Sequence, residues 1–536
     1  MENSWSLTEE SALFAPVLDI AGTRELEKIY LQSDGYGLMQ YAAGCIFSRI
    51  KALLQGLSQG NICKNRDIWI FAGGGNNGGD GYEIATGLVN DGFVNVMVVQ
   101  VLPQKKQIAA CRAREVYLAT GGREITFDEG FLKTAVTGNG VIIDAILGIG
   151  VTAGRMEQKN PVSPSAAKTA AAVSFINRIK LIHGEGLLVI SVDIPSLLDA
   201  DRGIPAGETA VTADITYTVF TEKPGLLTGR AKEFCGRVEV VADGLPRFKE
   251  NVAGIISGVI PELQYADFKV LRKRLPRRSP AAHKGTAGKV LLVGGSAGMT
   301  GALILAASAA VRCGSGLVAA MPVSGENIQF NSCNPCIMTP DISALEERLV
   351  WADAVAVGPG LGRNNTENIL KECIIGAKKA VFDADALYLL ANSDGKFPRL
   401  PAAVLTPHAG EAARLCGVSV REIEGDMVRY AIQIAEKYQA VCVLKSSSTV
   451  IATQEGKCIL TRTGCSGMAS GGMGDVLTGV IVSLMGQGYQ PESAAVMGVL
   501  LHGEAGRLEA EINGNIGMCA TDIPDRIRQL VNGKNA

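Results

Sequence analysis

The feature that most constrains the fold is an alternation, from Ile62 to Leu245, of short β-branched runs with Ala- and Gly-rich segments of helical pattern. The runs are DIWIFAG, FVNVMVVQVL, GVIIDAIL, GLLVISVDI and ADITYTVF. Strands that alternate with helices form parallel sheets, because each helix returns the chain across the sheet in a right-handed crossover. The alternation predicts a parallel α/β domain, with a helix from Gly81 after the first run and a helical pair within 24–54 ahead of it.

A second alternating series follows, with the runs GKVLLVGG, GLVAAM, AVAVGPG, KAVFDADAL, AAVLTPHAGE and AVCVLKSSST. Between Ile256 and Lys284 the pattern lapses into a basic, Pro-containing stretch. Such a stretch is typical of a solvated linker, although its charge would also suit phosphate or RNA. We therefore predict an N-terminal domain at 1–250, a linker at 251–275 and a C-terminal domain at 276–536.

Composition agrees with this division and excludes several classes of protein. A chain of 536 residues is too long for one core, and 47% hydrophobic residues with only 5% aromatics suit buried parallel sheets. Fifty-one basic against 53 acidic residues give a net charge of −2, so no nucleic-acid partner is expected. The start, MENSWSLTEESALFAP, lacks the pattern of a secretory signal, and the longest uncharged stretch, 290–311, contains four glycines, so no membrane span is expected. Thirteen scattered cysteines indicate reduced thiols and a cytoplasmic location.

The N-terminal series contains a glycine-rich turn after its first strand. FAGGGNNGGDGYEIA, at 71–85, predicts a strand, a glycine loop and a helix, a geometry that lets backbone N–H groups approach an anion. A tight structural turn is the alternative. Two asparagines and an aspartate within the loop favour ligand binding.

Two later strands of the same series carry acids at their ends. Asp144 follows an apolar run in VIIDAILGIG, and Asp193 and Ser196 follow another in ISVDIPS. Carboxylates at a buried sheet edge are costly unless they are paired, hydrogen-bonded or bound to a cation. With Asn77 they offer only hard oxygen ligands, which suit an alkali or alkaline-earth ion better than zinc. Capping of the following helices is the alternative role for any one of them.

The C-terminal series contains the clearest single motif, GMASGGMGDVLTGVIVSLM at 467–485. Here a glycine-rich loop ends in Asp475 and opens an apolar helix, so that N–H donors and a carboxylate meet at one point. This pattern is typical of phosphoryl transfer, although the sequence contains no GxxxxGK[ST] motif. A close helix–sheet contact made by small residues is the alternative.

The N-terminal half resembles the NAD(P)H-hydrate epimerase family over most of residues 20–245. GGGNNGGDG (73–81), DAILGIG (144–150), VDIPS (192–196) and TEKPGLLTG (221–229) match its motifs in order. The resemblance implies a Rossmann-like fold, K⁺ bound by Asn77, Asp144 and Ser196, and Asp193 at the reacting nicotinamide ring as general acid/base. It also implies contacts to the hydrated dinucleotide from Asn76, Asn77, Gly78, Gly79, Asp80, Gly148, Ile149, Gly150, Val151, Thr152, Ala153, Gly154 and Asp193. Leu197 departs from the family, which has glycine there. If the backbone freedom of glycine is needed at this position, a β-carbon is expected to distort the Ser196 loop and to affect the epimerase activity more than the fold.

The C-terminal half resembles the ribokinase-like superfamily and, within it, NAD(P)H-hydrate dehydratase, over 276–530. The matching motifs are HKGTAGKVLLVGGSAGMTGA, GPGLG, FDADAL, LTPHAGEAARL, LKSSST and GMASGGMGD. The resemblance implies that Asp475 is the catalytic base and that Mg²⁺ accompanies ADP or ATP. The implied contacts to the hydrated dinucleotide are Ala302, Gly360, Gly362, His408 and Asp475. The implied contacts to the adenine nucleotide are Lys445, Ser446, Ser447, Ser448, Thr449 and Gly474.

Together the two resemblances imply two three-layer α/β/α domains that repair hydrated nicotinamide dinucleotides, NADHX and NADPHX. The N-terminal half would interconvert the R and S hydrates, and the C-terminal half would dehydrate the S form with ADP or ATP. The resemblance also implies a homo-oligomer. The alternative is a ribokinase-like small-molecule kinase with a non-catalytic dinucleotide-binding module at its N-terminus.

Overall fold

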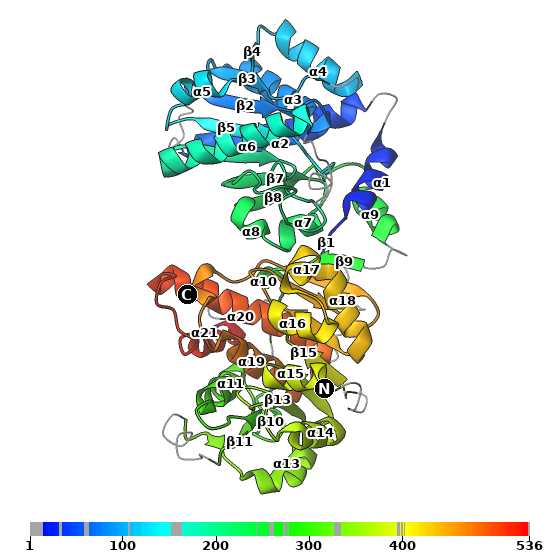
Figure 1. Cartoon of the computed structure of the whole chain (residues 1–536), viewed down its shortest axis with the longest axis vertical. Helices are drawn as coiled ribbons and strands as arrows, with labels where there is room; N and C mark the ends of the chain where they lie inside the picture. The colour runs from blue at the N-terminus through cyan, green and yellow to red at the C-terminus, as the bar shows by residue number, and fades with distance from the viewer. Residues whose placement is uncertain are drawn as a thin grey trace. The chain divides into compact units, whose positions relative to one another are not determined.

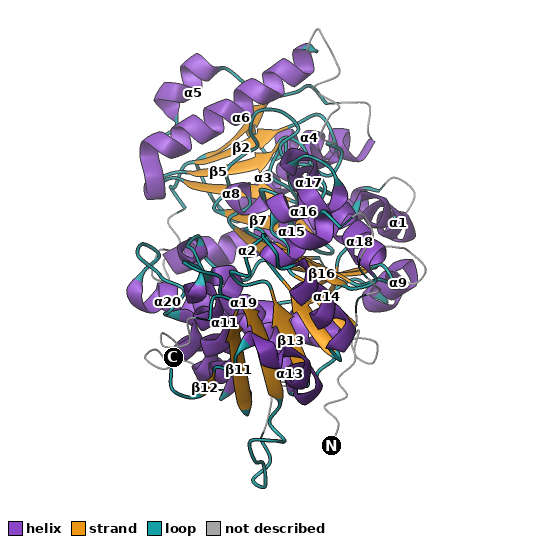
Figure 2. Ribbon diagram, turned by 60° about the horizontal axis from the view of Figure 1, so that its bottom comes forward, coloured by secondary structure: helices purple, strands orange, loops and turns teal. Residues whose placement is uncertain are grey.

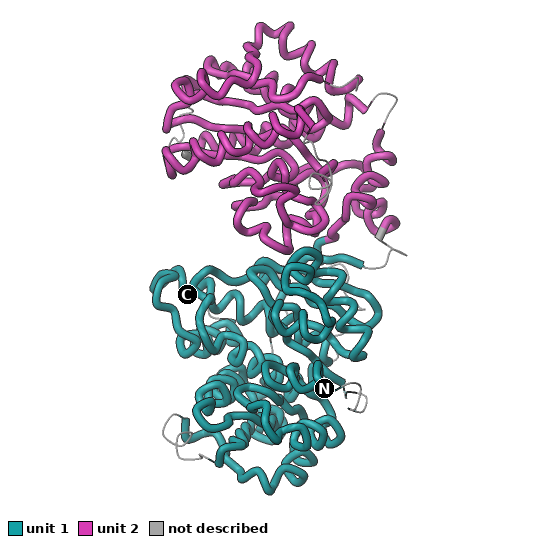
Figure 3. Tube along the Cα trace, viewed as in Figure 1, with its two compact units in different colours: residues 1–15, 260–536 teal, residues 16–259 magenta. Residues whose placement is uncertain are grey.

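The computed structural model divides the chain into two compact units (Figure 3), one of Pro16–Val259 and one of Met1–Ala15 with Ile260–Ala536. The structure describes residues 14–31, 35–57, 64–104, 108–151, 163–242, 244–256, 262–271, 275, 278–325, 334–393, 397, 400 and 402–533. Both units are α/β with largely parallel sheets (Figure 1), which confirms the predicted fold class.

The N-terminal unit is built on a seven-stranded sheet in the order β4-β3-β2-β5-β6-β7-β8, and all its neighbouring strands are parallel. Strand order reverses between β2 and β5, the position at which open α/β sheets bind ligands at their carboxyl edge. The strands are β2 (Ile68–Ala72), β3 (Val96–Gln100), β4 (Arg123–Thr126), β5 (Val141–Ala145), β6 (Leu188–Val192), β7 (Ile215–Val219) and β8 (Arg237–Val241).

Alternate residues of these strands pack into two separate cores, one on each face of the sheet. One core contains α2 (Tyr36–Leu57), α3 (Asn76–Asn90) and α4 (Ile108–Ala119), and the other contains α5 (Glu129–Ala135) and α6 (Pro164–His183). This arrangement is the predicted three-layer architecture, and α2 with α1 (Ile20–Tyr30) confirms the predicted helical pair. The shorter helices are η2 (Gly184–Gly186), α7 (Pro224–Leu227), α8 (Ala231–Phe234) and α9 (Phe248–Ile256).

The start of α3 corrects the sequence prediction, because the helix begins at Asn76 and not at Gly81. Asn76–Asp80 are therefore its first turns and not a loop. A Cβ at Gly78 would lie 1.9 Å from the carbonyl oxygen of Gly73, so only glycine allows the helix to start this close to the end of β2. Close packing thus overrides the poor helix propensity of two adjacent glycines.

The C-terminal unit contains an eleven-stranded sheet in the order β1-β9-β18-β17-β16-β15-β14-β13-β10-β11-β12. Neighbours from β12 to β16 are parallel, whereas β16–β17 and β17–β18 are antiparallel. The strands are β1 (Ala15–Pro16), β9 (Glu262–Tyr265), β10 (Lys289–Gly294), β11 (Leu317–Pro322), β12 (Ile337–Met338), β13 (Ala354–Val357), β14 (Lys379–Phe382), β15 (Ala402–Leu405), β16 (Val441–Leu444), β17 (Thr449–Ala452) and β18 (Lys457–Thr461).

Helices cover both faces of this sheet (Figure 2). On one face, a single core joins the sheet to four helices: α11 (Thr300–Cys313), α19 (Met473–Gly486), α20 (Pro491–Asn513) and α21 (Ile523–Val531). Three helices outside that core also pack against strands: α13 (Leu345–Trp351), α14 (Glu367–Gly376) and α18 (Met427–Tyr438). The remaining helices are α10 (Phe268–Leu271), η3 (Ile342–Ala344), α15 (Asp385–Ala391), α16 (Ala409–Cys416), α17 (Val420–Gly425) and η4 (Ser466–Met468).

The segment predicted as a linker, 251–275, contains regular structure. It includes the end of α9, strand β9, which pairs with β18, and α10. Residues 272–274 of this segment, and 276–277 directly after it, lie outside the described residues. Across the described parts of both units, none of the helices combines the length and the apolar character needed to cross a bilayer.

Candidate active sites

The N-terminal candidate site lies where β2, β5, β6 and β7 end, and its centre is the buried carboxylate of Asp144 at the end of β5. Asp144 accepts bonds from the Ser196 hydroxyl (2.5 Å), the Ser196 N–H (2.8 Å), the Ser191 hydroxyl (3.0 Å) and the Ile146 N–H (3.3 Å). Burial raises the pKa of Asp144, and the bonds from Ser196 oppose that rise. Asp144 therefore fixes the Ser196 loop against β5. These bonds satisfy the buried carboxylate, which would be costly without a partner.

Asn77 is the third residue that the sequence assigned to a cation. It lies in the first turn of α3, is 9% exposed, and packs against Gly148, where a Cβ would be 3.4 Å from its Cγ. Its amide nitrogen has no hydrogen-bond partner among the described residues. The Leu147 carbonyl also lies within 3.3 Å of the Ser196 hydroxyl. Hard oxygens from amide, carboxylate, hydroxyl and carbonyl groups fit K⁺. Among the described residues, no group of three or more His, Cys, Asp or Glu is arranged to hold a metal ion.

The glycine loop after β5 lies beside Asn77. Gly148, Ile149 and Val151 are half-buried and Gly150 is exposed. Thr152, Ala153 and Gly154, which the sequence also assigned to the hydrated dinucleotide, lie outside the described residues.

Asp193, the predicted acid/base, follows β6 in a left-handed conformation with φ +66°. Its carboxylate pairs with Lys223 at 2.6 Å, and Lys223 is fully buried. Sequence reasoning missed Lys223, although it lies in the TEKPG motif. The sequence did contain a signal for it: a lysine shortly after β7 lies at the same sheet edge as the acid that follows the neighbouring strand β6.

Two further carboxyl groups, those of Asp80 and Glu27, lie near Asp193. Burial, with the nearby charges of Asp193, Glu27 and Glu83, raises the pKa of Asp80 well above its usual range. Burial and Asp193 likewise raise the pKa of Glu27, a residue of α1 that sequence reasoning did not single out. Two acids with raised pKa values beside Asp193 are a pattern typical of proton-transfer sites.

Leu197 has a strained backbone, but the distortion of the Ser196 loop expected from the sequence is absent. Its φ is +71°, a region that L residues rarely adopt, and its side chain is 3% exposed in the core beside α6. Because Ser196 keeps both bonds to Asp144, the strained leucine leaves the loop geometry intact.

The C-terminal candidate site forms around the start of α19. Asp475 lies in the first turn of this helix, whose N-cap, Gly472, has φ +88° and no side-chain capping bond. A Cβ at Gly472 would lie 2.5 Å from a methyl of Leu305 on α11, so the turn requires glycine. Burial and the charge of Asp383 raise the pKa of Asp475 to about 7, with Lys445 opposing the rise. A carboxylate tuned to neutral pH suits general base catalysis.

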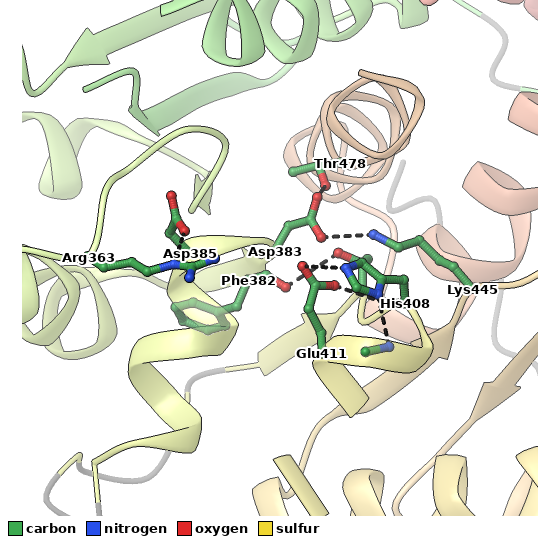
Figure 4. A network of polar contacts seen from close by, with 10 residues as sticks. Arg363, Phe382, Asp383, Asp385, His408, Glu411, Lys445 and Thr478 are labelled. Carbon is green, nitrogen blue, oxygen red and sulfur yellow. Dashed lines mark hydrogen bonds and ion pairs between the residues drawn. The ribbon is translucent and has the colours of Figure 1, made fainter. Parts of the chain in front are cut away.

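A network of polar side chains follows three neighbouring strands (Figure 4), and the charges of its members Asp383 and Lys445 act on Asp475. Asp383, after β14, accepts bonds from Lys445 Nζ (2.9 Å) and from the Thr478 hydroxyl on α19 (2.8 Å). Burial alone would lower the pKa of Lys445. The negative charges of Asp383 and Glu411 have the larger combined effect, so the pKa of this lysine is raised. Sequence reasoning named the FDADAL segment but assigned no role to Asp383, to Glu411 or to Thr478.

The loops assigned to the nucleotide and to the substrate meet at Lys445. The Lys445 N–H donates to the Pro407 carbonyl at 2.8 Å, which joins the LKSSST and LTPHAGE segments. A Cβ at Gly474 would lie 3.3 Å from Lys445 Nζ, so the glycine loop covers the lysine. Ser446 and Ser447 continue the loop, Ser448 has a buried hydroxyl without a partner among the described residues, and Thr449 begins β17.

His408 has a structural role in addition to its predicted one. Its Nδ1 accepts the Gly410 N–H at 3.0 Å, and Glu411 accepts the His408 N–H at 2.9 Å, so the pair forms a capping box for α16. The imidazole is 58% exposed, which leaves it accessible to a ligand.

The remaining predicted substrate residues surround the GPGLG turn. Gly360 and Gly362 both have positive φ, and the Gly362 N–H donates to Asp385 at 2.9 Å. Asp385 also pairs with Arg363 at 2.8 Å, so this unpredicted acid fixes the turn (Figure 4). Ala302 is half-buried on α11, and Met299, the N-cap of this helix, lies beside Gly360.

The fold defines a two-domain α/β enzyme with one candidate site at the carboxyl edge of each sheet. Comparison with known proteins gives each domain a family. Residues 35–225 match the family model described as YjeF-related protein N-terminus, and residues 290–529 match the model described as NAD(P)H-hydrate dehydratase.

Whole-length relatives span both units. The bifunctional NAD(P)H-hydrate repair enzyme of Escherichia coli is 35% identical, covering 86% of this chain and 84% of its own. The enzyme of the same name from Moorella thermoacetica is 37% identical, with 87% of each chain covered. The ADP/ATP-dependent NAD(P)H-hydrate dehydratase of Bacillus subtilis, co-crystallized with ATP/Mg²⁺, is 30% identical over 51% of this chain and 98% of its own, with a TM-score of 0.45. This chain belongs to the family of bifunctional NAD(P)H-hydrate repair enzymes.

Proposed function

We propose that the chain restores NADH and NADPH from their hydrates, NADHX and NADPHX, by epimerisation in the N-terminal unit and nucleotide-dependent dehydration in the C-terminal unit. The observation that carries the dehydratase assignment is Asp475, a carboxylate with a pKa of about 7 at the glycine-rich start of α19. The helix N-terminus and its free N–H groups would bind phosphate beside this base.

The dehydratase chemistry follows from that arrangement. Asp475 accepts the proton of the C6 hydroxyl while the terminal phosphoryl group of ADP or ATP is transferred to that oxygen. Phosphate then leaves with the C6–O bond electrons as C5 loses a proton, which forms the C5–C6 double bond. Ser446–Thr449 and Gly474 would bind the nucleotide, and Lys445 would neutralise phosphate charge. Mg²⁺ bound with the nucleotide would screen the phosphates.

The epimerase chemistry needs one mobile proton. C6 of the hydrate is a hemiaminal carbon, whose configuration can invert by reversible opening once its hydroxyl proton is removed. Asp193 is the proposed acid/base, and Asn76–Asp80 with 148–154 would hold the dinucleotide. K⁺ held by Asn77, Asp144 and Ser196 would supply positive charge beside the first turn of α3.

Two further assignments are part of the proposal. Eleven described cysteines are free thiols, which supports a cytoplasmic location. Family resemblance supports a homo-oligomer, which light scattering coupled to size exclusion tests directly.

The dehydratase is tested with purified S hydrate, Mg²⁺ and either ADP or ATP, comparing the wild type with Asp475→Asn. We expect reduced nicotinamide and free phosphate from the wild type only. A stable phosphorylated product would instead identify a small-molecule kinase. The epimerase is tested on purified R hydrate without nucleotide: chromatography should show much faster formation of an R/S mixture with the wild type than with Asp193→Asn, which should keep a low residual rate.

A further inference from the structure

Lys223 and Asp193 lie at the ends of neighbouring parallel strands. Asp193 directly follows β6, and Lys223 lies four residues after β7. The Asp193 N–H donates to the Tyr217 carbonyl at 2.8 Å, which holds its left-handed backbone against β7. The pair therefore connects two strands at the edge where the hydrate is proposed to bind.

All the hydrogen-bonding capacity of Lys223 is used within the protein. Its ammonium group donates to Asp193 Oδ1 (2.6 Å), the Val219 carbonyl (2.7 Å) and the Thr218 hydroxyl (2.8 Å). An ammonium group has three N–H donors, and the Lys223 side chain is 0% exposed. Lys223 thus has neither a free donor nor access to a ligand, and its effect on chemistry must pass through Asp193.

The two carboxylate oxygens of Asp193 differ. Oδ1 accepts bonds from Lys223, from the Val219 N–H (3.1 Å) and from the Thr218 hydroxyl (3.4 Å). Oδ2 has no hydrogen-bond partner in the part of the chain that the structure describes. The Asp193 side chain is 14% exposed, in contrast to the fully buried Lys223.

We infer that Lys223 is a positioning residue for the epimerase: it fixes Asp193 through Oδ1 and leaves Oδ2 as the oxygen that exchanges a proton with the hydrate. The inference rests on the proposed epimerase activity.

The test compares Lys223→Met, which keeps the side-chain length and removes the charge, with Lys180→Met as a matched control. Lys180 pairs with Asp214 at 2.6 Å and donates to the Leu187 carbonyl in the same unit. We expect Lys223→Met to lower kcat for R-to-S conversion about 100-fold with little change in KM, the scale typical of a misplaced reacting group. Lys180→Met should leave kcat unchanged.

A double variant separates positioning from folding. If Lys223 acts only through Asp193, adding Lys223→Met to Asp193→Asn should cause no further loss of activity. Ethylammonium, but not ethanol, should partly restore Lys223→Ala. Unchanged kcat in Lys223→Met, an additive loss in the double variant, or equal rescue by ethanol would each overturn the inference. Absence of epimerisation by the wild type would instead overturn the proposed function.

Discussion

Leu197 offers a direct test of backbone strain in the Ser196 loop, because its φ of +71° favours glycine while its side chain is buried. Two substitutions separate these effects. Leu197→Ala removes the side chain and keeps a β-carbon in the left-handed conformation. Leu197→Gly removes both.

The magnitudes predict an unusual order. Removing a buried leucine costs about 2–5 kcal/mol of unfolding free energy in either variant. A left-handed L residue costs roughly 1–2 kcal/mol, and glycine loses about 0.5–1 kcal/mol relative to alanine through the entropy of the unfolded chain. Leu197→Gly should therefore be more stable than Leu197→Ala, by up to about 1.5 kcal/mol.

Leu198 is the matched control, since it is also fully buried but is not among the residues with positive φ. At this position alanine should be more stable than glycine by about 0.5–1 kcal/mol. Urea unfolding in a Trp5→Phe, Trp351→Phe background leaves Trp69 of β2 as the reporter of the N-terminal unit. A Leu197→Ala variant more stable than Leu197→Gly would refute the strain argument.

Three further predictions follow from the two sites. Asp475 must be ionised to accept a proton, so dehydratase kcat/KM should fall as pH decreases through about 7, as a pH–rate profile with S hydrate will show. Asp383→Asn removes a charge that raises the pKa of Asp475, so the same profile should move to lower pH; a shift to higher pH would contradict this. Asn77→Ala removes one proposed K⁺ ligand while keeping the Asp144 bonds, so replacing Na⁺ by K⁺ should raise the melting temperature of the wild type but not of the variant.

The sequence predicted the two α/β units and the segments of both sites, because parallel strands bring their carboxyl ends to one edge and their loops carry the polar residues. The sequence placed the start of α3 five residues late, because the low helix propensity of glycine argued against a helix at Asn76–Asp80. The reason for the glycines, the close approach of Gly78 to Gly73, is visible only in the structure. The local sequence pattern therefore locates the glycine-rich segment but does not predict its conformation.

Partner residues were harder to predict than site segments. Lys223 contacts an acid 30 residues away, and Lys445 contacts Asp383 across 62 residues. These pairs are created by strand order, which spacing along the chain does not reveal. Leu197 is the opposite case: a departure from a family motif indicated a position whose backbone is strained, although the expected distortion of the Ser196 loop is absent.

The central claim is that one chain repairs both epimers of the hydrate. An R/S mixture of NADPH hydrate with K⁺, Mg²⁺ and either ADP or ATP should recover its full reduced-nicotinamide absorbance with the wild type, and Asp475→Asn should recover none. Recovery that stops once the S form is consumed would contradict the epimerase half, and no recovery with either nucleotide would contradict the dehydratase half.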